Sequence, residues 1–143
     1  MFIISGFIFF ISLISALLLM ANNKMKTVKI IGVIFAVLVL PLIAILIIYI
    51  VIGKDLSFVI YLCLIISYLV AELLLDMVFK IDFRSKTSRH VPYIILEWAA
   101  CFSFLFGTLT LDITIGWIIA VFFWTFIGVL VYYIVKQRKK KET

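Results

Sequence analysis

The chain has 143 residues, of which 67% are apolar and only 14% are charged, and its mean hydropathy is +1.37. A soluble domain contains about 45–50% apolar and about 25% charged residues, so the composition excludes a water-soluble globular protein, and the same apolar excess excludes a disordered chain. A disulfide-stapled secreted module is excluded because there are only two cysteines, both inside apolar runs. Lipid is therefore the expected solvent, and the composition predicts a small integral membrane protein.

Five long apolar stretches divide the chain. A transmembrane helix needs about 20 mostly apolar residues to cross a bilayer core about 30 Å thick, and the stretches that meet this requirement are 2–21, 28–53, 58–79, 91–109 and 113–135. They are continuous rather than alternating and are too long for barrel strands, which favours helices. The sequence therefore predicts a single domain, residues 1–143, that is an all-α polytopic bundle of five transmembrane helices with a basic tail at 136–143.

The first stretch and the junction between the last two each allow more than one interpretation. We expect the first stretch to be a retained anchor rather than a cleaved signal peptide, because the positive charges follow it and no small-x-small site ends it. The fourth and fifth stretches are separated only by Thr110, Leu111 and Asp112. One continuous helix here would far exceed the bilayer thickness, and Asp112 is a good N-cap. A tight hairpin is therefore predicted.

Positive charge gathers on one side of the predicted bundle. Twelve of the 13 basic residues lie in three segments that five alternating helices bring to the same side: Lys24, Lys26 and Lys29 after the first helix, Lys80, Arg84, Lys86 and Arg89 after the third, and Lys136, Arg138, Lys139, Lys140 and Lys141 in the tail. Only Lys54 falls on the other side. Because basic loops stay in the cytoplasm, the sequence predicts a multi-pass protein of the cell membrane with its N-terminus outside and its C-terminus in the cytoplasm.

The net charge of +6 raises the question of polyanionic partners. Nucleic acid is not expected, because the lysines flank membrane spans and aromatic residues do not interleave with them as a stacking surface requires. Anionic lipid headgroups are expected instead, at about 1 kcal/mol for each basic residue near the surface. The candidate headgroup ligands are Lys80, Arg84, Lys86, Arg89, Arg138, Lys139 and Lys140.

Aromatic residues near the ends of spans indicate the two membrane interfaces. Trp117 fits the outer aromatic belt, and Tyr132 and Tyr133 fit the inner one. Trp98 and Trp124 lie deeper in their spans, so we expect both to pack between helices.

Three acidic side chains lie inside the predicted spans, where each costs about 2.5–3.5 kcal/mol at a helix centre. Residues four apart share one face of a helix, and the faces that carry the acids form two polar stripes: Tyr61, Tyr68, Glu72 and Asp76 on the third helix, and Tyr93, Glu97 and Cys101 on the fourth. At about 1.5 Å per residue, Glu72 lies ~11 Å and Glu97 ~9 Å from the cytoplasmic ends of their helices. The two carboxyl groups are therefore expected at the same level.

Two facing carboxyl groups in a low-dielectric region cannot both stay ionised without a cation or a shared proton. We therefore take Glu72 and Glu97 as a candidate site for a proton or a cation, with Asp76 leading to the cytoplasm. Tyr61, Tyr68, Tyr93 and Cys101 are the candidate lining residues.

Each acid also has a structural explanation. Asp76 has Lys80 four residues later, which is the favourable order for an interfacial ion pair. Glu72 is explained equally well as a neutral acid that bonds to a tyrosine or backbone group on another helix. Glu97 is within reach of Arg84 or Arg89 if either side chain extends inward from the loop.

Three functions fit these features. The first is a proton- or cation-linked transporter or channel-like component that uses the buried carboxyl groups. The second is a non-catalytic subunit or assembly factor of a larger membrane complex. The third is a metal-dependent enzyme acting on lipid at the cytoplasmic face, with His90 beside the acids, but no nucleophile, phosphate loop or metal-ligand spacing supports it. No metal and no cofactor are expected.

Five helices with short loops are expected to enclose little interior. A transport pathway would then form between chains, so either a homo-oligomer or a partner membrane protein is expected.

Overall fold

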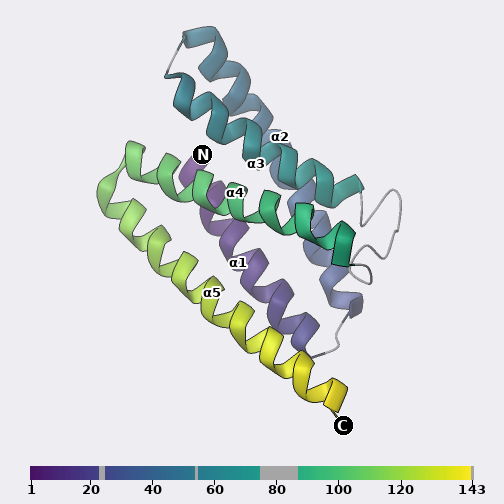
Figure 1. The fold of residues 1–143 in the computed structure, drawn as a ribbon. Coiled ribbons are helices and arrows are strands. Elements are labelled where there is room, and N and C mark those ends of the chain that lie inside the picture. Colours follow the sequence, from purple (N-terminus) through teal and green to yellow (C-terminus); the bar gives the residue numbers. More distant parts are fainter. Residues whose placement is uncertain (23–24, 54, 75–86, 143) are drawn as a thin grey trace.

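The computed structural model consists of five α-helices (Figure 1): α1 (Phe2–Ala21), α2 (Met25–Ile52), α3 (Leu56–Leu73), α4 (Thr87–Leu111) and α5 (Ile113–Glu142). It describes residues 1–22, 25–53, 55–74 and 87–142, without the side chains of 25–29, 87–92, 138 and 140–142. Every helix contains a stretch long and apolar enough to cross a membrane. The prediction of an all-helical chain with five candidate spans is confirmed for the described residues.

The helix ends differ most from the predicted spans at three places, and four other ends differ by one to three residues. α4 begins at Thr87, four residues before the predicted start, and α5 continues through the basic tail to Glu142. The tail is helical because Lys, Arg, Gln and Glu are strong helix formers and neither glycine nor proline interrupts it. The third predicted span ends at 79, whereas α3 is described only to Leu73, and 75–79 lie outside the described residues.

The predicted hairpin between α4 and α5 is present, with Asp112 as its only linking residue. The Asp112 carboxylate accepts a hydrogen bond of 3.0 Å from the backbone N–H of Ile115, which is the N-cap interaction expected from the sequence. Gly116 faces the last turns of α4, and a Cβ atom there would lie only 2.8 Å from the Cα of Leu109. The missing side chain therefore lets α5 approach the backbone of α4.

The turn between α2 and α3 also depends on glycine. Gly53 follows the last residue of α2 and has a φ of 68°, a left-handed conformation that glycine adopts without steric cost. Its N–H donates to the carbonyl of Ile50 at 3.2 Å. The turn therefore ends α2 and reverses the chain within a few residues.

The five helices form a closed ring in which each packs on its neighbours in sequence and α5 packs on α1. α1 also contacts α4, and Figure 1 shows α1 passing behind α4, with α2 on one side and α5 on the other. Lys136 helps to close the ring, because its Nζ donates to Asn22 Oδ1 at 2.7 Å. Alternating helix directions give the bundle an amino end, with Met1, Gly53 and Asp112, and a carboxyl end, with Asn22 and Glu142.

The amino half of the bundle is filled by a phenylalanine cluster, which we define as Phe2, Phe9, Phe10, Phe58 and Phe104. The ring centroids of Phe2 and Phe58 are 4.8 Å apart, and those of Phe9 and Phe104 are also 4.8 Å apart. Such tilted aromatic contacts add to the stabilisation from buried area. The cluster leaves this half of the ring densely packed.

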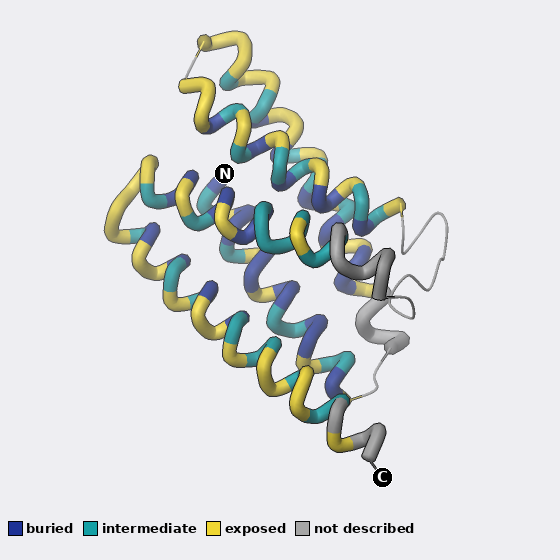
Figure 2. The backbone as a smooth tube through the Cα atoms, in the orientation of Figure 1, coloured by how far each residue is buried: buried dark blue, intermediate teal, exposed yellow. Residues whose placement is uncertain are grey.

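Apolar side chains also cover the outside of the bundle, as expected for a protein dissolved in lipid. Figure 2 shows buried residues where helices face one another and exposed residues on the outer faces. Trp117 is 68% exposed and Trp124 is 69% exposed. The expectation that Trp124 packs between helices is therefore wrong. The buried face of α5 runs through Ile119, Phe123 and Phe126, and a helix turns by about 100° per residue, so the residue after Phe123 points away.

Candidate functional site

A cavity of about 350 Å³ lies in the carboxyl half of the bundle. All five helices contribute to its lining, which consists of Leu13, Ala16, Leu17, Met20, Ile31, Gly32, Phe35, Tyr68, Glu72, Tyr93, Ile94, Glu97, Trp98, Leu130, Tyr133 and Ile134. One chain thus encloses a substantial interior, and the expectation that five helices leave little space is wrong. Small residues explain part of the space, since Gly32 has no atom within 4 Å of the position a Cβ would take.

Three polar side chains of this lining form a hydrogen-bonded group. Tyr93 on α4 donates a hydrogen bond to the Oε2 atom of Glu72 on α3, and the hydroxyl oxygens of Tyr93 and Tyr68 are 3.0 Å apart. Tyr68 and Glu72 are one helical turn apart and so project from the same face of α3. The two polar stripes expected from the sequence therefore face each other where α3 packs on α4.

The hydrogen bonds in this group have a definite direction. A tyrosine hydroxyl has one hydrogen to donate, and Tyr93 uses it on Glu72. Tyr68 must then donate to Tyr93, so the oxygen of Tyr68 keeps capacity to accept a further hydrogen bond. The chain of donors runs from Tyr68 through Tyr93 to Glu72.

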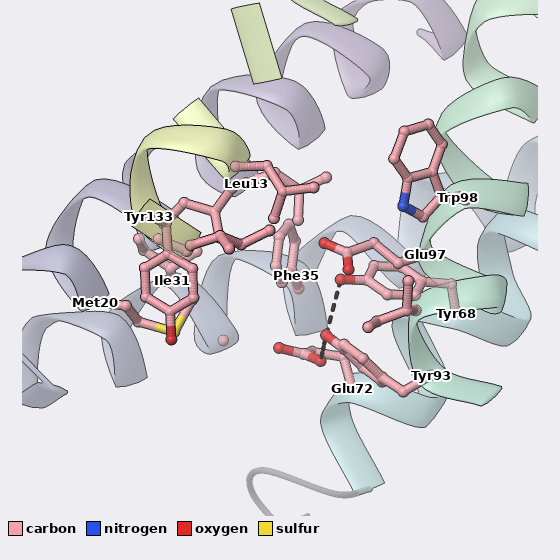
Figure 3. Close-up of a pocket in the computed structure, with 16 residues that line it drawn as sticks. Leu13, Met20, Ile31, Phe35, Tyr68, Glu72, Tyr93, Glu97, Trp98 and Tyr133 are labelled. Atoms are coloured by element: carbon pink, nitrogen blue, oxygen red, sulfur yellow. Dashed lines mark hydrogen bonds between the residues drawn. The ribbon is translucent and has the colours of Figure 1, made fainter. Parts of the chain in front are cut away.

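Glu97 completes the polar side of the cavity. It lies one turn after Tyr93 on α4, and Figure 3 shows its carboxyl group pointing toward the hydroxyl of Tyr68. Glu72 is 6% exposed and Tyr68 is fully buried. The structure thus brings together four of the residues singled out from the sequence, two acids with two tyrosines between them, in surroundings where the charged form of an acid is costly without a proton or a cation.

Aromatic packing holds Tyr68 and Trp98 in place. The ring of Tyr68 meets Phe9 edge-on at 5.7 Å and Phe35 at 6.4 Å between centroids. Trp98 meets Phe123 edge-on at 5.8 Å. Because Phe9 belongs to the phenylalanine cluster, Tyr68 lies at the boundary between the filled amino half and the cavity.

Two candidate lining residues lie elsewhere. Tyr61 is beside Gly107 in the amino half, where its ring lies 3.6 Å from the position of a Cβ on that glycine. Cys101, one turn beyond Glu97, is completely buried in the helix contacts. Neither lines the cavity. Both share a helix face with the acids, but the cavity ends at the level of Tyr68.

Several predicted residues lie outside the described side chains, so their roles stay predictions: Asp76, Lys80, Arg84, Lys86, Arg89, His90, Arg138 and Lys140. Lys139 is described and exposed, as a residue that meets headgroups would be. The described residues contain no group of three His, Cys, Asp or Glu side chains placed to hold a metal.

Sequence patterns missed the apolar side of the cavity. Phe35, Met20 and Ile31 lie in uniformly apolar runs that mark no particular position. Tyr133 was expected in the inner aromatic belt, yet it lines the cavity, while Tyr132 next to it is 50% exposed. Only the packing of α5 on α1 decides which of the two tyrosines faces inward.

No protein family, curated protein or solved structure matches this chain. A function must therefore be inferred from the cavity and from the residues that line it.

Proposed function

We propose that this chain is a small transport-like membrane protein that takes up a proton or a cation at Glu72 and Glu97. The observation that carries the proposal is the hydrogen-bonded group of Glu72, Tyr93 and Tyr68, with Glu97 facing the same cavity. Acids inside membrane helices are expensive and mark ion or proton pathways by default. Two of them beside one cavity make an uptake site the simplest explanation of their burial.

The tyrosines offer a route between the two acids. With Glu72 ionised and Glu97 protonated, each hydroxyl donates toward Glu72. If the proton leaves Glu97 for Tyr68, Tyr68 passes its own to Tyr93, and Tyr93 passes its own to Glu72, then Glu97 ends ionised and Glu72 ends protonated. Every hydroxyl keeps one hydrogen, and the charge moves from one acid to the other. The two acids therefore share one acidic proton, which is bound either to Glu97 or to Glu72.

We further propose that the protein lies in the cell membrane with the carboxyl end of the bundle in the cytoplasm. Along the sequence, twelve of the 13 basic residues follow the first, third and fifth apolar stretches, and positive charge after a span retains that side in the cytoplasm. Lys136 and Lys139 on the last turns of α5 belong to this set. In this orientation the cavity lies in the cytoplasmic half and the phenylalanine cluster in the outer half.

A proton-flux measurement tests the transport proposal. Purified protein is reconstituted into liposomes that contain a pH-sensitive dye, and an inside-negative potassium diffusion potential is set with valinomycin. Wild-type protein should acidify the interior faster than occurs in protein-free liposomes. Glu72→Gln and Glu97→Gln should each reduce the rate to the protein-free level, because an amide does not take up a proton at neutral pH.

Asp55→Asn is the matched control, since it makes the same carboxyl-to-amide change at an exposed position outside the cavity. It should keep the wild-type rate. Wild-type flux equal to that of protein-free liposomes would overturn the proposal, as would unchanged flux in both glutamine variants.

A further inference from the structure

The cavity is much larger than an uptake site for a proton or a bare ion requires. A cavity needs only about 10–15 Å³ to hold one water molecule, whereas this one has about 350 Å³. Small-molecule pockets in proteins begin at about 300 Å³. The volume therefore fits an organic molecule.

The lining has one polar side and one apolar side. α3 and α4 contribute the two acids and their tyrosines, while α1 and α2 contribute only apolar side chains among the described lining residues. Figure 3 shows Leu13, Met20, Ile31 and Tyr133 across the cavity from Glu72 and Glu97, with Phe35 between the two sides. A molecule that fills the space must have a polar end and an apolar body.

The polar side favours a positive charge. The described titratable groups that face the cavity are Tyr68 and Glu72 from α3, Tyr93 and Glu97 from α4, and Tyr133 from α5. Carboxylates attract a cation strongly where water is excluded. Trp98, Phe35 and Tyr133 also line the cavity, and the face of an aromatic ring can hold an organic cation by cation–π attraction.

We propose that the cavity binds an amphiphilic organic cation, with its charge at Glu72 and Glu97 and its apolar body against α1, α2 and α5. The inference rests on the proposed function in that it uses the same two acids. Protons compete with the organic cation for these carboxyl groups, so binding weakens as the pH is lowered. Protons and the organic cation therefore compete for one site.

The fluorescence of Trp98 can report binding directly, because Trp98 lines the cavity. Because the other two tryptophans, Trp117 and Trp124, lie on the outer surface, replacing both with phenylalanine leaves Trp98 as the only tryptophan without changing the cavity. Benzyltriethylammonium is titrated into this protein in mild detergent. Its neutral analogue, in which carbon replaces the nitrogen, tests the need for charge, and tetramethylammonium tests the need for an apolar body.

Benzyltriethylammonium should give a saturable change in Trp98 fluorescence, and the other two compounds should bind more weakly. The double change Glu72→Gln, Glu97→Gln should raise the Kd by about 30-fold or more. Gly32→Leu should abolish binding, because the new side chain enters a space with no atom within 4 Å. Gly128→Leu is its matched control, an exposed glycine on α5 outside the lining, and should bind like the parent protein.

Three results would overturn the inference: no saturable signal, equal binding of the neutral analogue, or undiminished binding by a folded Gly32→Leu variant. Equal binding of the neutral analogue would identify a purely apolar cavity, such as one for a lipid tail. The proton-flux assay contains no organic cation, so its result is independent. Proton flux without binding of the organic cation would reject this inference and leave the proposed function intact. Binding of the organic cation without proton flux would reject the proposed function and leave this inference intact.

Discussion

Tyr93 is the residue through which α3 and α4 meet in the polar side of the cavity. Its hydroxyl donates to Glu72 and lies 3.0 Å from the hydroxyl of Tyr68. Hydrogen bonds between membrane helices contribute about 0.6 kcal/mol on average and up to about 1.7 kcal/mol. Tyr93 therefore contributes modestly to stability, while the proposed passage of a proton between the acids uses its hydroxyl between Glu72 and Tyr68.

Tyr93→Phe keeps the ring and removes the hydroxyl, so it separates these two roles. We expect the free energy of unfolding to fall by about 0.6–1.7 kcal/mol and proton flux in liposomes to drop several-fold. Tyr61→Phe loses a hydroxyl from the polar stripe of α3 at a position outside the cavity and should leave flux unchanged. If both variants conduct protons like the wild type, Tyr93 is only a packing residue.

At the scale of helices, the α4–α5 hairpin is set by one acid and one glycine. Asp112 caps α5 at its first turn, and Gly116 removes the side chain that would separate the two helices. The aspartate is visible in the sequence because N-cap preferences are local. The need for glycine is not, because it depends on where Leu109 lies across the hairpin.

Gly116→Ala should therefore lower the stability of the folded protein, and Gly128→Ala should raise it. An added Cβ at 116 would lie 2.8 Å from the backbone of Leu109, so we expect overpacking to cost about 1–3 kcal/mol. At 128 the space is open, and alanine should stabilise the helix by up to about 1 kcal/mol through its higher helix propensity. Thermal unfolding of both variants in one detergent measures the difference, and equal shifts would contradict this account of the hairpin.

At the scale of the whole molecule, the amino half of the five-helix bundle is densely packed, whereas the carboxyl half contains a cavity. The phenylalanine cluster fills the amino half, and the cavity occupies the carboxyl half. All five helices of one chain contribute to the lining of this cavity. In the proposed orientation, a ligand in the cavity would be separated from the outside by the cluster.

Cysteine labelling on intact cells tests this orientation. In a chain whose two native cysteines are replaced by alanine, Asp55→Cys places a thiol at the amino end and Lys139→Cys places one at the carboxyl end, both at exposed positions. A membrane-impermeant maleimide should label the first and reach the second only after the cells are opened. The reverse pattern would show that the charge distribution does not set the orientation.

Part of the site was predictable because it depends on spacing along single helices. Tyr68 and Glu72 on one stripe, and Tyr93 and Glu97 on the other, follow from the four-residue repeat. Their hydrogen bonds required α3 and α4 to pack with those stripes together. Tyr61 and Cys101 share the stripes but not the cavity, because spacing specifies a face and not the depth at which neighbouring helices leave a space.

The sequence by itself determined the five helices, their length and apolar character sufficient to cross a membrane, the α4–α5 hairpin and the acids within these helices, since hydrophobicity, helix length and capping are properties of short segments. Only the tertiary structure decided that α5 closes on α1, that Tyr133 rather than Tyr132 faces inward, and that all five helices surround one cavity. Apolar side chains look alike along helices that are apolar on every side, so which of them face one another is decided by packing between helices.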